Sequence, residues 1–130
     1  MTTVLLDSHV IYWWSTDSER LSATAARAIS GAEQLAVASI TWFELAWLAS
    51  NGRIKAPMPV GTWLEALSQQ VLTVGTTPSI GDAAASLPDS FPGDPADRLI
   101  YATAIETGWK LVTKDERMRS LPHPGKLTVW

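Results

Sequence analysis

The chain has 130 residues, enough for one compact domain with its own core, and its composition marks no linker between two domains. It carries a net charge of −3 and no cysteine, which excludes disulfide frameworks, zinc–thiolate sites and thiol nucleophiles and argues against binding of nucleic acid by bulk positive charge. The first apolar run ends at Asp7, too soon for a signal peptide or a membrane span, so we expect a cytoplasmic protein with no membrane partner.

Apolar runs and helical periodicity divide the chain into short strands that alternate with helices. In its first part the pattern predicts a strand, two helices, a second strand and two further helices, at residues 4–6, 8–15, 23–30, 35–38, 39–50 and 60–70. Ser22 and Gly31 are the residue types expected at the start and the end of the second helix. Pro57 and Pro59 interrupt helical structure before residue 60.

The second part of the chain continues this alternation. It predicts strands at 71–74, 110–113 and 127–130, and helices at 79–87, 95–108 and 115–120. Buried strands that alternate with helices pair in parallel through right-handed crossovers. We therefore predict an α/β protein, a three-layer α/β/α sandwich around a central parallel sheet of four to five short strands, within a single domain over residues 1–130.

Four acidic residues lie where the chain passes from an apolar run into a predicted helix. Asp7 follows VLL, Glu44 lies in ITWFELAW, Asp97 lies in GDPADRLIYA, and Asp115 closely follows LVT. The carboxyl ends of parallel strands gather around one crevice, so acids far apart in the sequence are expected to meet there. Because clustered carboxylates repel one another, such a cluster usually holds a cation. The sequence therefore predicts a divalent-metal site.

Helix capping offers another explanation for some of the acidic residues. Asp7 and Asp115 each precede a predicted helix, and Asp is favoured at the N-cap position. Asp94 is followed by Pro95, which is the usual arrangement of an N-cap and the first helical residue. Capping and metal binding are compatible, so both interpretations stay open for these three residues.

Two other acids have local explanations of a different kind. Thr41 and Glu44 match the capping-box pattern, in which the Glu reaches back to the N-cap amide. Asp97 lies in the first turn of its predicted helix, where the helix dipole favours an anion, and its neighbour Arg98 is a possible ion-pair partner. Four independent explanations are less economical than one shared crevice.

The segments around these acids resemble a known family. In order, spacing and flanking sequence they are similar to the four acidic motifs of PIN-domain ribonucleases, especially the VapC-like toxins of bacterial toxin–antitoxin pairs, in LLDSHVIYWW, SITWFELAWL, GDPADRLIYATA and LVTKDERM. The resemblance spans nearly the whole chain and implies a PIN-like fold. By position, the metal-binding and catalytic acids of the family fall on Asp7, Glu44, Asp97 and Asp115, with Asp94 as a possible further ligand.

The resemblance implies an endoribonuclease that uses Mg²⁺, with Mn²⁺ as a substitute. Carboxylate oxygens suit these hard cations, which lower the pKa of a bound water so that it can attack an RNA phosphorus. Cleavage would leave 5'-phosphate and 3'-hydroxyl ends, and the expected partners are an RNA substrate, an inhibitory cognate antitoxin and a second copy of the chain. Two divalent ions would bring the net charge from −3 to about +1, so acidity does not exclude RNA.

The third and fourth motifs contain two further features of note. Pro92 and Gly93 occupy the place where many relatives carry a histidine before the Asp-Pro pair, so we assign no histidine to substrate handling. Thr113 matches a hydroxyl residue common in the fourth motif, where it would orient an acid or a metal-bound water.

Several basic and aromatic residues are possible RNA contacts. The basic ones near the predicted crevice are Arg98, Lys114, Arg117 and Arg119, of which Arg98 is also a possible supporting residue of the site. The aromatic ones are Trp13, Trp14, Trp42 and Trp47, whose helical spacing favours core or interface positions over base stacking.

Two other functional classes compete with a nuclease. A phospho-accepting receiver domain is also α/β with acids at strand ends, but it needs paired acids after its first strand, where this chain has Asp7, Ser8 and His9. The second alternative is a catalytically silent PIN-like module retained for protein binding, which the complete acidic set argues against.

Overall fold

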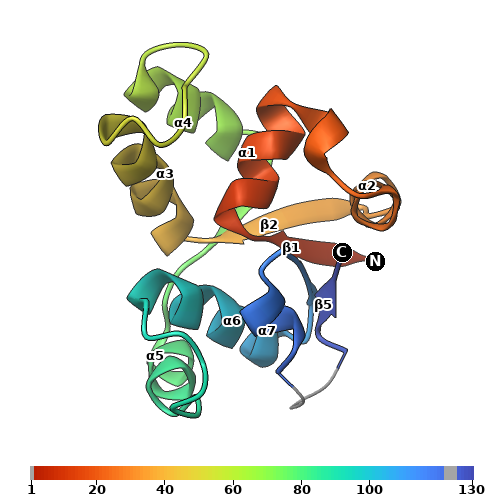
Figure 1. Ribbon diagram of the computed structural model, residues 1–130, viewed down its shortest axis with the longest axis vertical. Helices are drawn as coiled ribbons and strands as arrows, with labels where there is room; N and C mark the ends of the chain where they lie inside the picture. The colour runs from red at the N-terminus through yellow and green to blue at the C-terminus, as the bar shows by residue number, and fades with distance from the viewer. Residues whose placement is uncertain (1, 122–125) are drawn as a thin grey trace.

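A five-stranded parallel sheet lies at the centre of the protein in a computed structural model, which describes residues 2–121 and 126–130 (Figure 1). The strands follow the order β3-β2-β1-β4-β5, and every neighbouring pair is parallel. Their bounds are Thr3–Leu6 for β1, Gln34–Ala38 for β2, Leu72–Val74 for β3, Lys110–Val112 for β4 and Thr128–Val129 for β5. This confirms the predicted parallel sheet.

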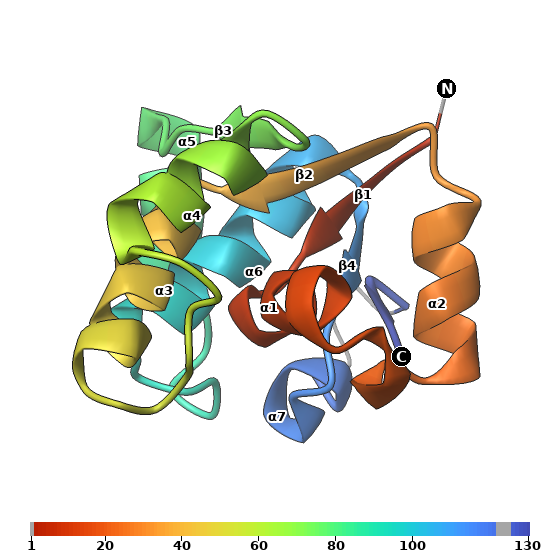
Figure 2. The same cartoon turned by 90° about the horizontal axis from the view of Figure 1, so that it is seen from above.

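Helices cover both faces of the sheet, so the protein has the predicted three layers (Figures 1 and 2). One face carries α1 (Ser8–Thr16), α2 (Ala23–Ser30), α3 (Ile40–Ser50) and α4 (Val60–Ser68). The other carries α5 (Pro78–Ala85), α6 (Pro95–Thr107) and α7 (Glu116–Arg119). A short 3₁₀ helix, η1 (Ser18–Arg20), joins α1 to the segment before α2 and was not predicted.

The side chains of β1 alternate between the two faces and hold both helical layers. Val4 and Leu6 belong to the core that packs beneath α1, α2, α3 and α4. Leu5 belongs to the second core, with residues of α6 and α7, and is fully buried. Burial on both faces explains why the strand reads as a continuous apolar run.

Most predicted helix boundaries agree with the structure because their capping residues act as expected. The Ser22 hydroxyl accepts the amide of Ala25 at 3.0 Å at the start of α2. Helix α5 begins at Pro78, one residue earlier than predicted, because the Thr77 hydroxyl caps it and proline fits the first helical position. Gly108 ends α6 with a φ of 74°, a left-handed conformation that favours glycine.

Three strands end together at the edge of the sheet that faces α1, α3 and α6. Leu6 of β1 pairs with Val112 of β4, and the amide of Asp7 donates to the carbonyl of Val112 at 3.1 Å. Ala38 of β2 ends next to them and leads through Ser39 into α3. The residues that follow these strands are therefore brought close together. Among the described residues, no helix combines the length and apolar character needed to cross a membrane.

Candidate metal centre

Asp7 is the most deeply placed acid at this edge of the sheet. It is the N-cap of α1, and only 8% of its surface is exposed. Its Oδ1 accepts the Ser8 amide at 2.8 Å, and its Oδ2 accepts the Thr113 hydroxyl at 2.7 Å. The carboxylate is therefore held by the strand ends of both β1 and β4. The predicted cap is confirmed, and the cap leaves Asp7 within the cluster.

Glu44 reaches the same place from α3, and the capping-box prediction for it is wrong. Helix α3 already begins at Ile40, after a Ser39 whose backbone is helical, so Thr41 lies inside the first turn and cannot be the N-cap. The Glu44 carboxylate instead accepts a hydrogen bond from the Ser8 hydroxyl at the start of α1. Thr41 is fully buried, and its hydroxyl has no hydrogen-bond partner among the described residues.

The start of α6 supplies two carboxylates. Asp94 is the predicted N-cap, and its Oδ1 accepts the amides of Ala96 at 2.8 Å and Asp97 at 3.4 Å. Asp97 forms its ion pair with Arg117, at 3.6 Å, and not with Arg98 as its position suggested. Glu44, Asp94 and Asp97 each present one carboxylate oxygen within 4.8 Å of the others, so the three can share one cation.

Asp115 completes the set from the start of α7, where it is the N-cap as predicted. Its Oδ1 accepts the Arg117 amide at 2.8 Å, and its Oδ2 accepts the Arg117 guanidinium at 3.0 Å. Burial alone would raise its pKa, but the hydrogen bonds and positive charge of Arg117 outweigh burial and lower it. The Asp115 amide donates to the Thr113 hydroxyl at 3.1 Å, and that hydroxyl donates to Asp7. One threonine therefore positions both acids, in line with the expectation that Thr113 orients an acid of the site.

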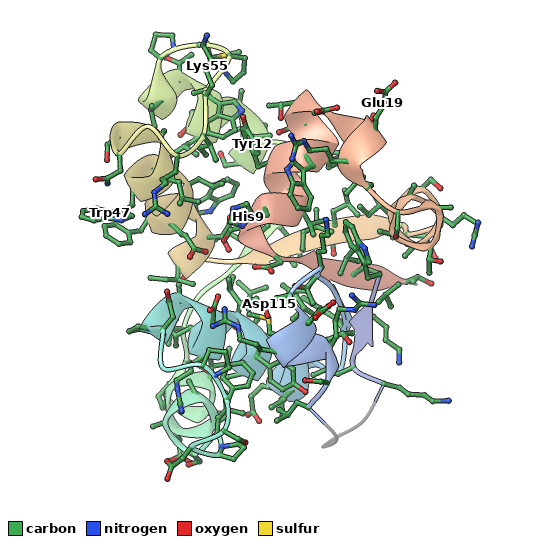
Figure 3. All side chains as sticks on the ribbon, in the orientation of Figure 1. His9, Tyr12, Glu19, Trp47, Lys55 and Asp115 are labelled. Atoms are coloured by element: carbon green, nitrogen blue, oxygen red, sulfur yellow. The ribbon has the colours of Figure 1, made fainter. Side chains whose placement is uncertain are left out.

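All five acids line a single cleft with a volume of about 760 Å³. Figure 3 shows His9 on α1 and Asp115 before α7 on opposite sides of this region. The described lining also contains four basic side chains and one tryptophan; in full it is Asp7, His9, Trp13, Glu44, Arg53, Asp94, Asp97, Lys114, Asp115, Glu116, Arg117 and Arg119. The structure thus brings together every acid that the motifs singled out.

The buried acids of the cleft resist ionisation in the absence of a cation. Burial raises the pKa of Asp7 and of Glu44. Burial and the negative charges of Asp94, Asp7 and Glu44 raise the pKa of Asp97 to about 7. Like charges held this close favour a bound cation, and an all-oxygen donor set fits a hard divalent ion such as Mg²⁺ or Mn²⁺.

Arg98 is held by the loop between α5 and α6. Its guanidinium donates to the carbonyls of Pro92 and Ala84, each at 3.0 Å, and lies 5.9 Å from the centre of the Phe91 ring. Because these bonds turn the side chain towards the loop between α5 and α6, it does not line the cleft. Arg98 therefore anchors the loop that carries Asp94, and its contact with RNA stays a prediction.

The tryptophans divide between core and surface. Trp14 and Trp42 pack against the core beneath α1 to α4, and the Trp42 indole donates to the Thr73 hydroxyl at 3.0 Å. Trp13 is half-buried and lines the cleft. Trp47 is 57% exposed. The core interpretation therefore holds for two of the four.

Sequence reasoning missed two contributors to the site, Ser8 and Arg53. Ser8 follows Asp7 directly and bonds Glu44, so adjacency to a motif acid was the available signal. Arg117 was predicted to lie near the crevice, but its pairing with Asp115 and Asp97 was not. Arg53 lies in the loop after α3, where no motif marks it.

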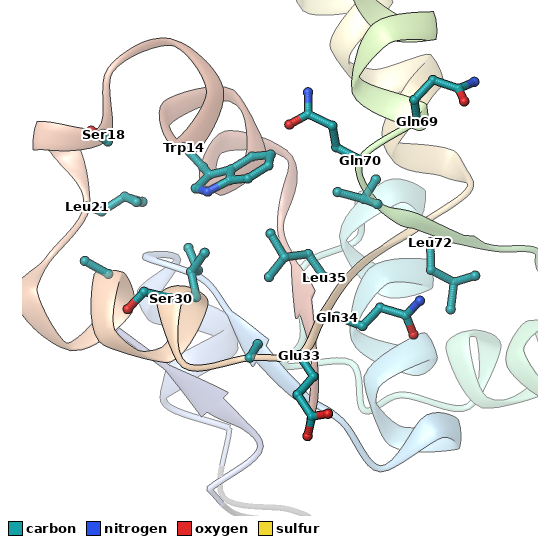
Figure 4. A pocket seen from close by; sticks show the side chains of 14 residues that line it. Trp14, Ser18, Leu21, Ser30, Glu33, Gln34, Leu35, Gln69, Gln70 and Leu72 are labelled. Atoms are coloured by element: carbon teal, nitrogen blue, oxygen red, sulfur yellow. The ribbon is translucent and has the colours of Figure 1, made fainter. Parts of the chain in front are cut away.

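A second hollow, of about 700 Å³, lies at the opposite end of the sheet beside α2 and the starts of β2 and β3 (Figure 4). Its described lining contains one carboxylate, Glu33, among apolar and amide side chains such as Leu35 and Gln70. One carboxylate does not form a carboxylate cluster, so the cation site belongs to the first cleft.

Comparison with known proteins identifies the family. A family model described as PIN domain matches residues 4–124. The chain belongs to the PIN-domain family. A relative named Ribonuclease VapC22, from Mycobacterium tuberculosis, is 64% identical over 130 residues, which cover 100% of both proteins. The resemblance to VapC-like PIN domains is therefore confirmed, and a receiver domain is excluded.

Solved structures share the PIN fold. A chain of a toxin–antitoxin complex from Klebsiella pneumoniae matches with a TM-score of 0.69 and 20% identity, over 98% of this PIN domain and 96% of that chain. A chain of VapBC2 from Rickettsia felis, bound to a DNA fragment from its promoter, matches with a TM-score of 0.67 and 15% identity, over 93% and 94%. At these identities the likeness establishes the fold alone.

Proposed function

We propose that residues 1–130 form one catalytic domain, an endoribonuclease that depends on Mg²⁺, accepts Mn²⁺ as a substitute and acts as the toxin of a toxin–antitoxin pair. The observation that carries this proposal is the convergence of the predicted acids in one cleft. The 64% identical relative is named a ribonuclease, which supports RNA as the substrate.

The carboxylates of the cleft fall into two groups by their distance from a single cation position. Glu44, Asp97 and Asp94 are close enough to ligate one cation, while Asp7 and Asp115 face the same space from the ends of β1 and β4. When bound, a divalent ion supplies Lewis acidity to the phosphoryl group and lowers the pKa of water. Asp7, Glu44, Asp97 and Asp115 are the proposed catalytic set, and hydrolysis leaves a 5'-phosphate and a 3'-hydroxyl.

Supporting hydrogen bonds keep these carboxylates in place. The Thr113 hydroxyl fixes Asp7, and the Ser8 hydroxyl fixes Glu44. Such outer contacts orient metal-binding groups and limit their motion, which conserves the geometry that the reaction needs.

Substitution of Asp7 by Asn tests the proposed activity. Asn keeps an oxygen that can cap α1 but removes the charge, so cleavage of total cellular RNA with Mg²⁺ should disappear while the metal-free protein stays as stable as the wild type or becomes more stable. Mapping of new 5' ends reports the activity and the cleavage site together. Cleavage by the Asp7→Asn variant at the wild-type rate would contradict the proposal, and a wild-type protein that folds but never cleaves would favour the silent protein-binding module.

We also propose that the protein binds a cognate antitoxin and forms a homodimer. The structural relatives are toxin–antitoxin complexes, which supports the antitoxin. On α3, Phe43 and Trp47 are 64% and 57% exposed, and their rings stack 6.2 Å apart, so this apolar pair is our proposed contact between copies.

Light scattering coupled to size exclusion tests this contact. The double variant Phe43→Ser/Trp47→Ser should be a monomer where the wild type is a dimer. Leu72→Ser provides the control, because Leu72 is also exposed, at 40%, but lies on β3. A dimer that survives the double substitution would place the interface elsewhere.

A further inference from the structure

A groove of about 660 Å³, separate from the hollow beside α2, adjoins the metal cleft. His9, Trp13 and Arg53 line both the groove and the metal cleft, so these two cavities meet at those side chains. One wall of the groove is α1, and the other is the loop from Gly52 to Lys55 that follows α3. A linear polymer bound at the carboxylates can therefore extend into this groove.

The charge of this groove is opposite to that of the carboxylate cluster. Besides Tyr12, its ionisable lining comprises Arg20, Arg53 and Lys55, together with His9 and a single carboxylate, Asp17. Asp17 is already paired with Arg20, at 3.3 Å. Arg53 and Lys55 are exposed, and neither forms an ion pair with a described residue. Two cations are thus free to meet an anionic ligand.

Contacts within the protein fix the shape of the groove before any ligand binds. The Tyr12 hydroxyl donates to the carbonyl of Lys55 at 3.1 Å and accepts its amide at 3.2 Å, so α1 holds the loop through both backbone groups of one residue (Figure 3). The Tyr12 ring in turn packs edge-on against Trp63, with centroids 5.9 Å apart. Gly52, with a φ of 70°, permits the turn that brings Arg53 round. A wall fixed in this way is preorganised for binding.

Aromatic rings occupy the junction of the two hollows. His9 is exposed and Trp13 is half-buried, and their ring centroids lie 5.7 Å apart. The Lys114 ammonium lies 5.8 Å from the centre of the Trp13 ring. Flat rings next to cations are the combination that binds single-stranded nucleic acid, since bases stack on the rings while phosphates meet the charges.

We propose that this groove binds the single-stranded RNA segment that flanks the bond to be cut. Arg53 and Lys55 contact its phosphates, and the rings of His9 and Trp13 stack on a base. This inference rests on the proposed ribonuclease function. An acidic peptide would also suit the cations, but only a nucleic acid uses the rings and the direct passage to the carboxylates as well.

Binding of a single-stranded RNA oligonucleotide tests the groove. The double variant Arg53→Gln/Lys55→Gln, compared in an Asp7→Asn background that prevents cleavage, should bind about tenfold or more weakly. Each lost phosphate contact lowers the slope of log K against log salt by about 0.7 for single strands, so the slope should fall by about 1.4. His9→Ala should weaken binding with an unchanged salt slope, because a stacked ring carries no counterion.

The matched control is Arg27→Gln/Lys110→Gln, which removes the same charge from exposed positions outside the metal cleft and the groove. It should bind like the parent. In the active background, the groove variant should raise KM for RNA, and the control should not. Equal affinity and equal salt slopes for groove variant and control would overturn the groove. Weaker binding by the groove variant in a protein that never cleaves RNA would support the groove and refute the nuclease instead.

Discussion

The carboxylate of Asp97 should make the stability of the metal-free protein depend on pH. Burial and nearby negative charge raise its pKa from 3.8 to about 7, and its side chain is only 15% exposed. The folded state therefore holds this proton more tightly than the unfolded state. The stabilisation that protonation confers is complete below pH 3.8 and is lost as the pH rises through 7. Between pH 5 and pH 8 this one group removes roughly 2.5 kcal/mol.

Asp97→Asn isolates that contribution, because the amide has a similar shape and does not ionise. Urea unfolding in EDTA at pH 5 and pH 8 should show the variant gaining roughly 2.5 kcal/mol on the wild type between the two pH values. Glu106→Gln, an exposed acid on the same helix, should show almost no such change. A stability difference between Asp97→Asn and wild type that is the same at both pH values would refute the electrostatic account of the cleft.

Three further outcomes follow from the same contacts. Mn²⁺ affinity, measured by calorimetry, should rise roughly tenfold from pH 6 to pH 8 because Asp97 must lose a proton with a pKa of about 7 to bind, and a flat profile would remove it from the ligand set. Thr113→Val removes the hydrogen bonds that Thr113 makes to the Asp115 amide and to Oδ2 of Asp7, so it should cost about 1–2 kcal/mol in urea unfolding and slow RNA cleavage, while Thr113→Ser retains both. Arg98→Met should cost about 2 kcal/mol by releasing the carbonyls it holds, with the salt slope of RNA binding unchanged; a changed slope would restore its predicted contact with RNA.

The parts of the fold that sequence reasoning captured are those set by local chemistry. The apolar runs around Leu5 and Leu111 predicted buried strands because β1 and β4 are covered on both faces. Asp94 before Pro95 predicted the start of α6, since that pair satisfies the first amides of a helix in any context. The meeting of Asp7 and Asp115 was also predictable, because β1 and β4 end at the same edge, whereas Asp97 starts a helix that follows a loop from α5 and not a strand.

The parts that it missed depend on side chains reaching between elements. Thr41 and Glu44 have the spacing of a capping box, but the early start of α3 moves Thr41 into the helix and leaves Glu44 facing Ser8 on α1. Arg98 adjoins Asp97 in the chain, yet its guanidinium is held by carbonyls of the preceding loop. Sequence neighbours suggest partners for a side chain, but packing between elements decides the partner, and here it is Ser8 for Glu44 and the carbonyl of Ala84 for Arg98.

In three acids of the cleft, the same oxygen, Oδ1, caps a helix: Asp7 for α1, Asp94 for α6 and Asp115 for α7. Asparagine retains one such oxygen, so exchanging Asp for Asn keeps the cap acceptor, removes the charge and replaces the second oxygen, which accepts a hydrogen bond in Asp7 and in Asp115, by an amide NH₂ group. Every Asp codon is one base away from an Asn codon. If the chain has the proposed toxin activity, one such point mutation would remove that activity while the helix caps persist, and selection for cells that survive its expression should recover such alleles alongside truncations.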